Sequence, residues 1–411
     1  MSATHPDAIA VRALQRLQSE GALRQVDIAF ADLLRDRLRA SASVALAGAL
    51  AMRAVAMGHS SFALAEAHRL LDALGTSAQL PDIADWAEAL LASDHVATAS
   101  DRHHAGALLT FENGRIALLR YARYEQHLAE QLYCRARTSK EAGIASSETK
   151  LAPMLRRLFS LDSSLLASSS QAPAAHANDH IDRQALAAIL ALRRRLLLIT
   201  GGPGTGKTTT VARLLAAQIA AAHASGHAPP RIALAAPTGR AAARLGEAID
   251  GVLRADLDAG RVDIANADAI PRQARTLHRL LGWQPRRVAF RHDAEHPLPF
   301  DVVVVDEASM VDLSLMAKLA AAVPAKARLV LLGDRRQLAS VEAGSVLADL
   351  ISPEATALKG ALVELVHVHR TRAGTPLARL GAALTAGTAE ALAAVSELLE
   401  ASADEIGRAH V

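Results

Sequence analysis

The chain has 411 residues, of which 51% are apolar and 3% are aromatic, and 45 Lys and Arg against 42 Asp and Glu give a net charge of +3. The length suggests two or three domains, and the apolar content is typical of a globular protein rather than a disordered one. So small a charge excess does not by itself indicate a nucleic-acid partner.

The single cysteine, Cys134, excludes an internal disulfide. We expect it to be a small buried hydrophobic side chain in a protein of a reducing compartment. The N-terminus lacks the charged and apolar regions of a secretory signal, and no run of about 20 residues is apolar enough to span a bilayer. These features favour a cytoplasmic location.

Residues 1–137 are predicted to form a mainly helical domain. Helical spacing of apolar residues occurs in five segments: 8–17, 27–40, 44–56, 61–74 and 83–91. Further on, residues 108–111 and 116–119 flank Asn113-Gly114, a dipeptide that supplies the positive φ angles of a tight turn. This pattern predicts a β-hairpin.

A helix is predicted to follow the hairpin, beginning R-Y-A-R-Y-E-Q-H-L-A at Arg120. Arg120 and Arg123 alternate with Tyr121 and Tyr124, a combination that can contact a DNA strand. An amphipathic helix that packs its tyrosines against a core explains the same pattern, and we favour it. Both interpretations stay open at the level of sequence.

Between residues 138 and 180 the composition shifts to serine, alanine and proline, which predicts a linker. Within it, Leu155–Phe159 is expected to form a short helical piece. From residue 181 strands alternate with helices, the signature of an α/β fold with a parallel sheet. The predicted elements are helix 183–191, a strand ending at Ile199-Thr200, helix 210–222, strand 232–235, helix 241–249, helical segment 276–281, and strands 302–305 and 329–332.

The segment after the strand that ends at Thr200 reads G-G-P-G-T-G-K-T-T-T. It contains G-x-x-x-x-G-K-T, the pattern of a phosphate-binding loop placed between a strand and a helix. Its glycines let successive backbone N–H groups point inward at phosphate oxygens, and the following helix adds its positive dipole end. Lys207 is expected to reach the outer phosphates, and Thr208 to offer a hydroxyl to Mg²⁺.

Acidic and polar side chains follow the later strands. Asp306, after V-V-V-V, is predicted to hold the magnesium ion, and Glu307 to act as the general base or to orient the attacking water. Gln337 lies just past the strand that ends in Gly333 and is placed to sense the γ-phosphate. Arg370 follows a strand-like run and is a candidate arginine finger.

Taken together, these motifs resemble the RecD family of superfamily 1 DNA helicases, the alpha subunits of exodeoxyribonuclease V. The resemblance covers residues 181–350 and rests on G-G-P-G-T-G-K-T-T-T, A-P-T-G-R-A-A-A-R-L, T-L-H-R-L-L-G, V-V-D-E-A-S-M-V-D and L-G-D-R-R-Q-L-A-S-V-E-A-G-S-V-L, in the family's order. It implies an ATP-dependent helicase that moves 5′ to 3′ and acts in double-strand break repair and recombination. ATP and Mg²⁺ are the implied cofactors.

The resemblance also assigns roles to residues. Nucleotide contacts are implied for Gln184, which would read the adenine edge, and for Gly201, Gly202, Pro203, Gly204, Thr205, Gly206, Lys207, Thr208 and Thr209. Single-stranded DNA contacts are implied for Pro237, Thr238, Arg240, Thr276 and His278. The implied partners are single-stranded DNA at double-strand break ends and the beta and gamma subunits, RecB and RecC, joined through the N-terminal domain.

The family pattern predicts a RecA-like ATPase domain over residues 181–350 and part of a second RecA-like domain over 351–404. The last seven residues, 405–411, can be back-translated into a common sequencing-adapter read, so we expect a truncated gene fragment with a non-native tail. Two other classes are weighed: a subunit that binds nucleotide and partners without turnover, and a P-loop kinase or transporter ATPase. The P-T-G-R and T-L-H-R segments argue against the latter.

Overall fold

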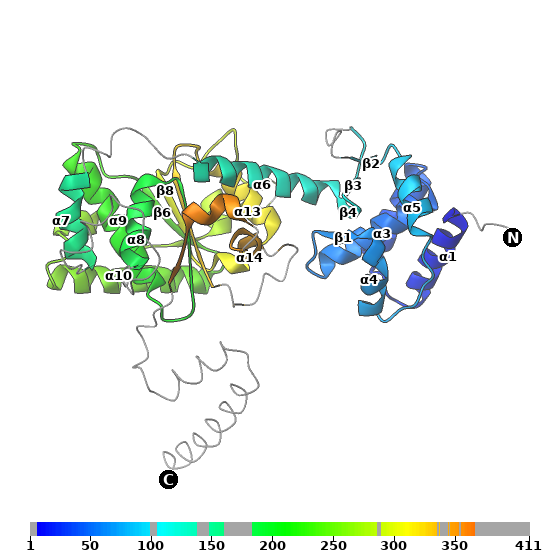
Figure 1. The fold of residues 1–411 in the computed structure, drawn as a ribbon, viewed down its shortest axis with the longest axis horizontal. Coiled ribbons are helices and arrows are strands. Elements are labelled where there is room, and N and C mark those ends of the chain that lie inside the picture. Colours follow the sequence, from blue (N-terminus) through cyan, green and yellow to red (C-terminus); the bar gives the residue numbers. More distant parts are fainter. Residues whose placement is uncertain are drawn as a thin grey trace, which may run out of the picture.

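The computed structural model describes residues 6–98, 105–137, 148–159, 183–285, 289–334, 337, 344, 346–352 and 355–365. Figure 1 shows two bodies joined by one long helix, α6 (Leu119–Arg137). The N-terminal body holds the residues before α6, and a second body is built around a larger sheet. None of the helices among the described residues combines the length and apolarity that crossing a bilayer requires.

The N-terminal body is mainly helical, as predicted. Its α-helices are α1 (Pro6–Ser19), α2 (Gln25–Asp32), α3 (Ala42–Ala56), α4 (Ala67–Ala73) and α5 (Ile83–Leu91). Helix α3 is buried on every side over Val44–Leu50. A helix segment without a polar face is stable in this position because all of its apolar surface is removed from water. Trp86 of α5 packs on it and donates its indole N–H to the Ser43 carbonyl at 2.9 Å.

A small sheet in the order β1-β4-β3-β2 flanks these helices. Its strands are β1 (Ser61–Ala63), β2 (Val96–Ala97), β3 (Leu109–Glu112) and β4 (Arg115–Leu118). The predicted hairpin is confirmed, with β3 and β4 antiparallel and both turn residues at positive φ, Asn113 at 49° and Gly114 at 71°.

Two helix predictions in this body were wrong in extent. The segment 61–74 is not one helix, because Ser61–Ala63 pairs as β1 with β4 and only Ala67–Ala73 is α-helical. Cross-strand pairing to a hairpin about 50 residues away is a long-range preference that outweighs local periodicity. The segment 27–40 divides into α2 and a π-helical turn, Leu33–Arg37, and ends before Arg39, which has φ 57°.

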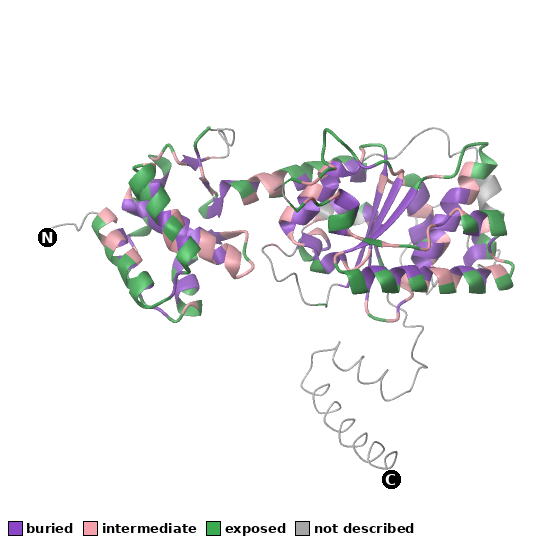
Figure 2. Cartoon of the chain, turned by 180° about the vertical axis from the view of Figure 1, so that it is seen from behind, coloured by how far each residue is buried: buried purple, intermediate pink, exposed green. Residues whose placement is uncertain are grey.

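The second body contains a parallel sheet of six strands in the order β10-β5-β9-β8-β6-β7. Its strands are β5 (Leu196–Gly201), β6 (Ile232–Ala236), β7 (Arg275–Thr276), β8 (Val302–Val305), β9 (Arg328–Gly333) and β10 (Leu362–Leu365). The central strands are buried along their length (Figure 2), which explains their continuous apolar sequences. The α/β prediction is therefore confirmed.

Alternate residues of the strands face two helical layers. One face packs with α6, α12 (Leu277–Leu281), α13 (Leu313–Ala322) and α14 (Val346–Leu350). The other packs with α7 (Glu148–Phe159), α8 (Arg183–Arg193), α9 (Lys207–Ala224), α10 (Gly239–Asp258) and α11 (Ile264–Asp268). Two 3₁₀ turns, Ala308–Met310 and Thr356–Ala361, complete this body.

The structure places two of the predicted domain boundaries differently, at the 138–180 linker and at residue 351. The expected helical piece at 155–159 is the end of α7, and Leu155, Leu158 and Phe159 pack into the sheet core, so this part of the 138–180 stretch is not linker. The start of a second RecA-like domain was placed at 351, but β10 pairs in parallel with β5 of the first sheet. Residues 366–404 and the 405–411 tail lie outside the described residues.

Helix α6 connects the bodies and packs on α13. Its Leu128 and Leu132 join the core beneath the sheet, and Tyr121 and Tyr124 pack against that core, as the amphipathic interpretation predicted. Cys134 is exposed on α6, contrary to the expectation of a buried thiol. The face of α6 that points to the sheet carries the leucines, so the cysteine is left on the solvent side.

Candidate nucleotide and DNA site

The candidate site lies along the carboxyl edge of the parallel sheet. Strands β5, β9 and β8 are neighbours, and the pairings Thr200 with Gly333 and Val305 with Leu331 bring their ends to the same edge. Adjacent strands are about 4.8 Å apart, so the residues that follow β5 and β8 emerge roughly 10 Å from each other. A nucleotide phosphate tail can therefore contact both.

The loop between β5 and α9 has the backbone that phosphate binding requires. Gly204 and Gly206 adopt left-handed conformations, at φ 78° and 84°, which a residue with a Cβ adopts only with strain. Thr205 Oγ1 donates to the Gly202 carbonyl at 2.9 Å, and Thr210 Oγ1 donates to the Gly206 carbonyl at 2.9 Å. These bonds hold the turn of the loop and leave the first N–H groups of α9 facing the edge.

Lys207 begins α9 and turns its side chain back over the loop. Its Nζ donates to the carbonyl oxygens of Gly201 and Gly202, the latter at 3.0 Å. The ammonium thus sits above the concave backbone where phosphate oxygens would be its stronger partners. The residues present fit a bound triphosphate.

Position 201 requires glycine because neighbouring atoms leave no room for a Cβ, and not because of its φ angle. A Cβ at this position would lie 2.6 Å from Thr205 Oγ1 and 2.8 Å from the Leu365 carbonyl oxygen. Leu365 is the last residue of β10 and pairs with Gly201. The outer strand β10 therefore presses directly on the base of the phosphate loop.

Asp306 and Glu307 follow β8, and the Asp306 carboxylate lies close enough to Lys207 for their charges to interact. Asp306 donates its N–H to the Ala235 carbonyl at 2.9 Å, and its Oδ1 accepts the N–H of Glu307 at 2.9 Å. Burial raises the pKa of Asp306, while the Glu307 N–H and the positive charge of Lys207 act in the opposite direction. The carboxylate and the ammonium are thus electrostatic neighbours across β9.

Glu307 has φ 51° and ψ 38°, a left-handed conformation for a residue with a side chain. Such backbone strain is concentrated at functional sites, where the surrounding structure holds it in place. Here the left-handed conformation turns the chain sharply directly after Asp306.

A magnesium ion would draw on few protein ligands at this edge. Among the described residues, no cluster of three or more His, Cys, Asp or Glu side chains could hold a metal by itself. Thr208 in the first turn of α9 and Asp306 after β8 supply one hydroxyl and one carboxylate. This sparse donor set suits Mg²⁺, which keeps waters and binds substrate phosphates as further ligands.

Two of the residues that follow β9, Asp334 and Gln337, are described by the structure. Asp334 is buried, and its carbonyl accepts the N–H of Gln337 at 3.2 Å, which leaves Gln337 exposed beside the edge. A Cβ at Gly333 would meet Cδ2 of Leu347 in α14, so a larger residue there would require the Leu347 side chain to move. Ser309 Oγ is buried without a hydrogen-bond partner in the described part of the chain, a feature that sequence reasoning missed.

Gln184 lies in the first turn of α8. The preceding residue, Arg183, donates Nη1 to the Glu364 carbonyl at 2.8 Å, and Glu364 pairs with Thr200 of β5. The first turn of α8 therefore sits at the same carboxyl edge as the phosphate loop. Arg370, the candidate arginine finger, lies outside the described residues.

The predicted DNA-contact residues gather at the neighbouring end of the sheet. Ala236 pairs with Thr276, so Pro237-Thr238 and Thr276 follow adjacent strands. Thr238 and Thr276 each cap a helix, with Oγ1 accepting the N–H of Ala241 at 3.2 Å and of Arg279 at 3.3 Å. Their hydroxyls are thus partly used by the fold. The side chains of Arg240 and His278 are exposed.

Sequence reasoning passed over Trp283, whose backbone N–H donates to the His278 carbonyl at 2.9 Å. It is 57% exposed, in a chain with only 2 tryptophans. An exposed indole in the segment directly after α12 offers a flat surface on which a base can stack. The signal available in the sequence was a tryptophan directly after the helix-ending Gly282.

Comparisons with known proteins agree with this arrangement. Residues 184–343 match the AAA domain family, and residues 19–116 match the family described as RecBCD enzyme subunit RecD, N-terminal domain. The RecBCD enzyme subunit RecD of Mycobacterium tuberculosis (strain ATCC 25618 / H37Rv) is 40% identical over 350 residues, which is 85% of this chain and 53% of that protein.

Two further relatives are similar over shorter stretches. The RecBCD enzyme subunit RecD of Mycolicibacterium smegmatis is 49% identical over 221 residues, 52% of this chain and 37% of that protein. The ATP-dependent RecD2 DNA helicase of Deinococcus radiodurans is 38% identical over 197 residues, 48% of this chain and 22% of that protein. The chain spans about half the length of the M. tuberculosis relative.

The parallel sheet, the phosphate loop and the acidic pair after β8 define a P-loop ATPase domain of the AAA class. A stretch that matches the RecD N-terminal domain precedes it in the same chain, and the match of 350 residues to the M. tuberculosis RecD includes parts of both regions. The chain is therefore similar to RecD proteins over both its N-terminal part and its ATPase domain.

Proposed function

We propose that this chain supplies the ATP-hydrolysing domain of a RecD-type DNA helicase, which moves 5′ to 3′ on single-stranded DNA at double-strand break ends. Support comes from the edge geometry and from relatives named as RecBCD subunits and as an ATP-dependent DNA helicase. Its biological setting is double-strand break repair and recombination in the cytoplasm.

The phosphate tail of ATP would lie over the loop from Gly201 to Thr209. The contacts proposed on the loop are the backbone N–H groups of Gly202, Gly204, Thr205 and Gly206, the ammonium of Lys207, and the hydroxyls of Thr208 and Thr209. Pro203, which has no N–H, would shape the loop around the phosphates. Lys207 would exchange its bonds to loop carbonyls for bonds to β- and γ-phosphate oxygens. Gln184, in the first turn of α8, would contact the adenine edge.

Hydrolysis would occur between the loop and β8. Mg²⁺, held by Thr208 and Asp306, would offset negative charge on the phosphate oxygens when bound. Glu307, which follows Asp306 in a left-handed backbone conformation, would accept a proton from the attacking water. Gln337 and Arg370 are proposed to sense the γ-phosphate, and Arg370 to neutralise charge in the transition state.

Single-stranded DNA would cross the carboxyl ends of β6 and β7. Pro237, Thr238, Arg240, Thr276 and His278 would contact its phosphates, and Trp283 would stack on a base. Contacts of this kind carry no base preference, which suits a motor that must move over any sequence.

The N-terminal body is proposed to be the subunit-interaction domain of a heterotrimer with RecB and RecC. Its support is the match of residues 19–116 to a RecD N-terminal domain and the printed names of the relatives. The division into an N-terminal domain, an ATPase domain and the start of a second motor domain stays a proposal.

The observation that carries the function is the proximity of Lys207 and Asp306, which follow β5 and β8 at one edge of one sheet. The test is ATP turnover with and without single-stranded DNA. We expect turnover that DNA stimulates, and an Arg240→Ala variant that keeps basal turnover and loses most of the stimulation.

Arg254→Ala, which removes an exposed arginine farther along α10, is the matched control and should respond to DNA like the unmodified chain. Turnover that DNA does not change would contradict the motor. An absence of turnover at any DNA concentration would favour the alternative, a chain that binds nucleotide and partner subunits only.

A further inference from the structure

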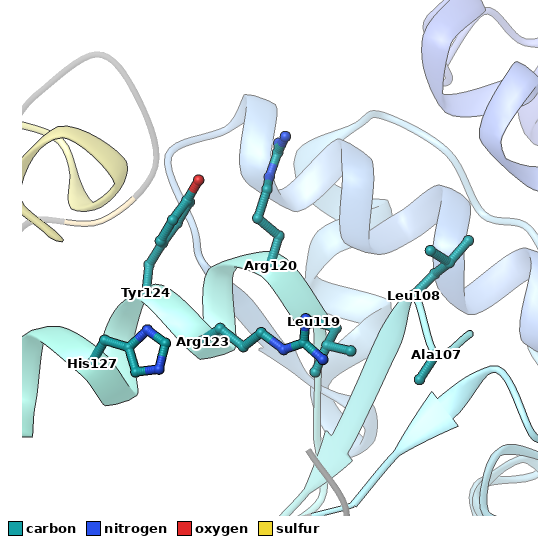
Figure 3. Close-up of a pocket in the computed structure, with 7 residues that line it drawn as sticks. All are labelled: Ala107, Leu108, Leu119, Arg120, Arg123, Tyr124 and His127. Atoms are coloured by element: carbon teal, nitrogen blue, oxygen red, sulfur yellow. The ribbon is translucent and has the colours of Figure 1, made fainter. Parts of the chain in front are cut away.

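A pocket of about 340 Å³ lies where the β-hairpin of the N-terminal body meets α6 (Figure 3). Its floor is apolar, formed by Ala107 and Leu108 before β3 and by Leu119 at the start of α6. Its remaining wall is polar and belongs to one helix. The proposed ATPase and DNA contacts use none of these residues.

That wall is basic and aromatic. Arg120, Arg123, Tyr124 and His127 line it from α6. Spacings of three and four residues place these side chains on one helical face, so two guanidinium groups, a phenol ring and an imidazole share a single concave surface. The nearest carboxylate along the helix, Glu125, accepts a hydrogen bond from Ser60 Oγ at 2.5 Å. The pocket therefore presents positive charge.

The pocket is connected to the proposed DNA site by a strip of ring and cation contacts. The ring of His278 lies against Phe290, with centroids 5.7 Å apart. The ammonium of Lys318 on α13 lies 5.4 Å from the Phe290 centroid and 5.9 Å from the centroid of Tyr124. Tyr124 lines the pocket. Aromatic and basic groups thus alternate from the end of β7 to the N-terminal body.

We propose that single-stranded DNA leaves the motor edge at His278, follows this strip past Lys318, and enters the pocket of Arg120, Arg123, Tyr124 and His127. Phosphates would contact the guanidinium groups, and a base would stack on the ring of Tyr124 over the apolar floor. The proposal rests on the proposed function, because it extends the DNA path that begins at His278.

Two features favour single-stranded DNA over an acidic protein partner. Alternating rings and cations match the alternation of bases and phosphates along a strand, whereas an acidic peptide would need cations alone. The strip is also continuous with residues that already sit at the proposed DNA edge. An acidic peptide in the pocket would leave the His278–Phe290–Lys318 contacts unexplained.

The test compares the affinity of the full chain for oligothymidines of about 8 and about 20 nucleotides, lengths chosen to fill the motor edge alone or to reach farther. We expect Arg120→Ala/Arg123→Ala to weaken binding of the long strand about tenfold and to leave the short strand within about twofold. The slope of log affinity against log salt for the long strand should fall by about 1.4.

Arg12→Ala/Arg69→Ala is the matched control, since it removes the same charge from exposed positions of α1 and α4. It should leave both affinities unchanged. Arg120→Lys/Arg123→Lys should restore most of the long-strand affinity, because phosphate contact needs charge while a packing role needs the shape of arginine. Thermal unfolding of each variant shows that the body remains folded.

The outcomes separate the two proposals. Absence of binding to the short strand would contradict the proposed function. Short-strand binding with equal long-strand affinity in the alanine variant and the unmodified chain would overturn the extended path alone. Binding of a polyglutamate peptide that the alanine variant loses, with DNA affinity intact, would assign the pocket to an acidic partner and also overturn it.

Discussion

Arg135 of α6 donates its Nη2 to the carbonyl of Val323, at the C-terminal end of α13, across 2.6 Å. The same guanidinium reaches the carbonyls of Ala320, Pro324 and Ala327. A buried cation thus closes the end of a helix that belongs to the ATPase body, where the dipole favours positive charge. Burial, together with the nearby charge of Arg195, lowers the pKa of Arg135.

Arg135→Ala is expected to lower the free energy of unfolding by about 3 kcal/mol, because it leaves buried carbonyl groups without a donor. Arg135→Lys should recover part of the loss, since one ammonium cannot reach four carbonyls. Urea denaturation measures both. Arg137→Ala, exposed two residues later, is the control and should cost within about 0.5 kcal/mol. Equal losses at the two positions would contradict the docking role of Arg135.

Gly201→Ala should lower stability and ATP affinity together. The new Cβ would meet Thr205 Oγ1 and the Leu365 carbonyl, and strain of this kind costs about 1–3 kcal/mol. Gly202→Ala is the comparison variant, because no atom lies within 4 Å of a Cβ there. Its thermal unfolding should match the unmodified chain. If both variants unfold alike, β10 does not press on the loop as described.

Lys207→Ala is expected to lower ATP turnover by about 100-fold or more, since it removes the cation nearest the developing phosphate charge. The fold should persist, because the hydrogen bonds of Lys207 to Gly201 and Gly202 stay within its own loop. Turnover assays and thermal unfolding test the two statements. Lys326→Ala, exposed at the opposite end of β9, should keep full turnover. Retained turnover in Lys207→Ala would remove the phosphate loop from the mechanism.

Asp306→Asn should stabilise the nucleotide-free chain while reducing turnover about 100-fold or more. Burial raises the pKa of Asp306, so the folded chain holds this proton to a higher pH than the unfolded chain does. The stability that Asp306 contributes is full below its unfolded pKa and is lost as pH rises through the raised folded pKa. The increase in the free energy of unfolding that Asp306→Asn produces should therefore be largest at neutral pH.

Thermal unfolding of Asp306→Asn and of the unmodified chain, measured between neutral pH and pH of about 4, gives their difference in stability. This difference should shrink as the pH falls toward the unfolded pKa of Asp306. Asp258→Asn, at the exposed end of α10, is the matched control. A stability gain that grows at low pH would show that the Asp306 carboxylate is favoured, rather than penalised, by its surroundings.

The sequence by itself determined the local chemistry of the site. A glycine-rich turn between an apolar strand and a helix, ending in Lys207-Thr208, allows one backbone arrangement, and four valines before Asp306-Glu307 specify a buried strand with carboxylates at its end. Parallel strands share a carboxyl edge, so the sequence also indicated that these groups would meet. Local stereochemistry and strand polarity carry that information.

The tertiary structure alone decided what depended on partners distant along the chain. It made Ser61–Ala63 a strand because β4 offers a free edge, and it drew α7 and β10 into the ATPase body because their apolar faces complete its layers. It also buried Arg135 and exposed Cys134 on one helix. Such outcomes follow from which surfaces meet across long sequence separations, a property that local spacing does not encode.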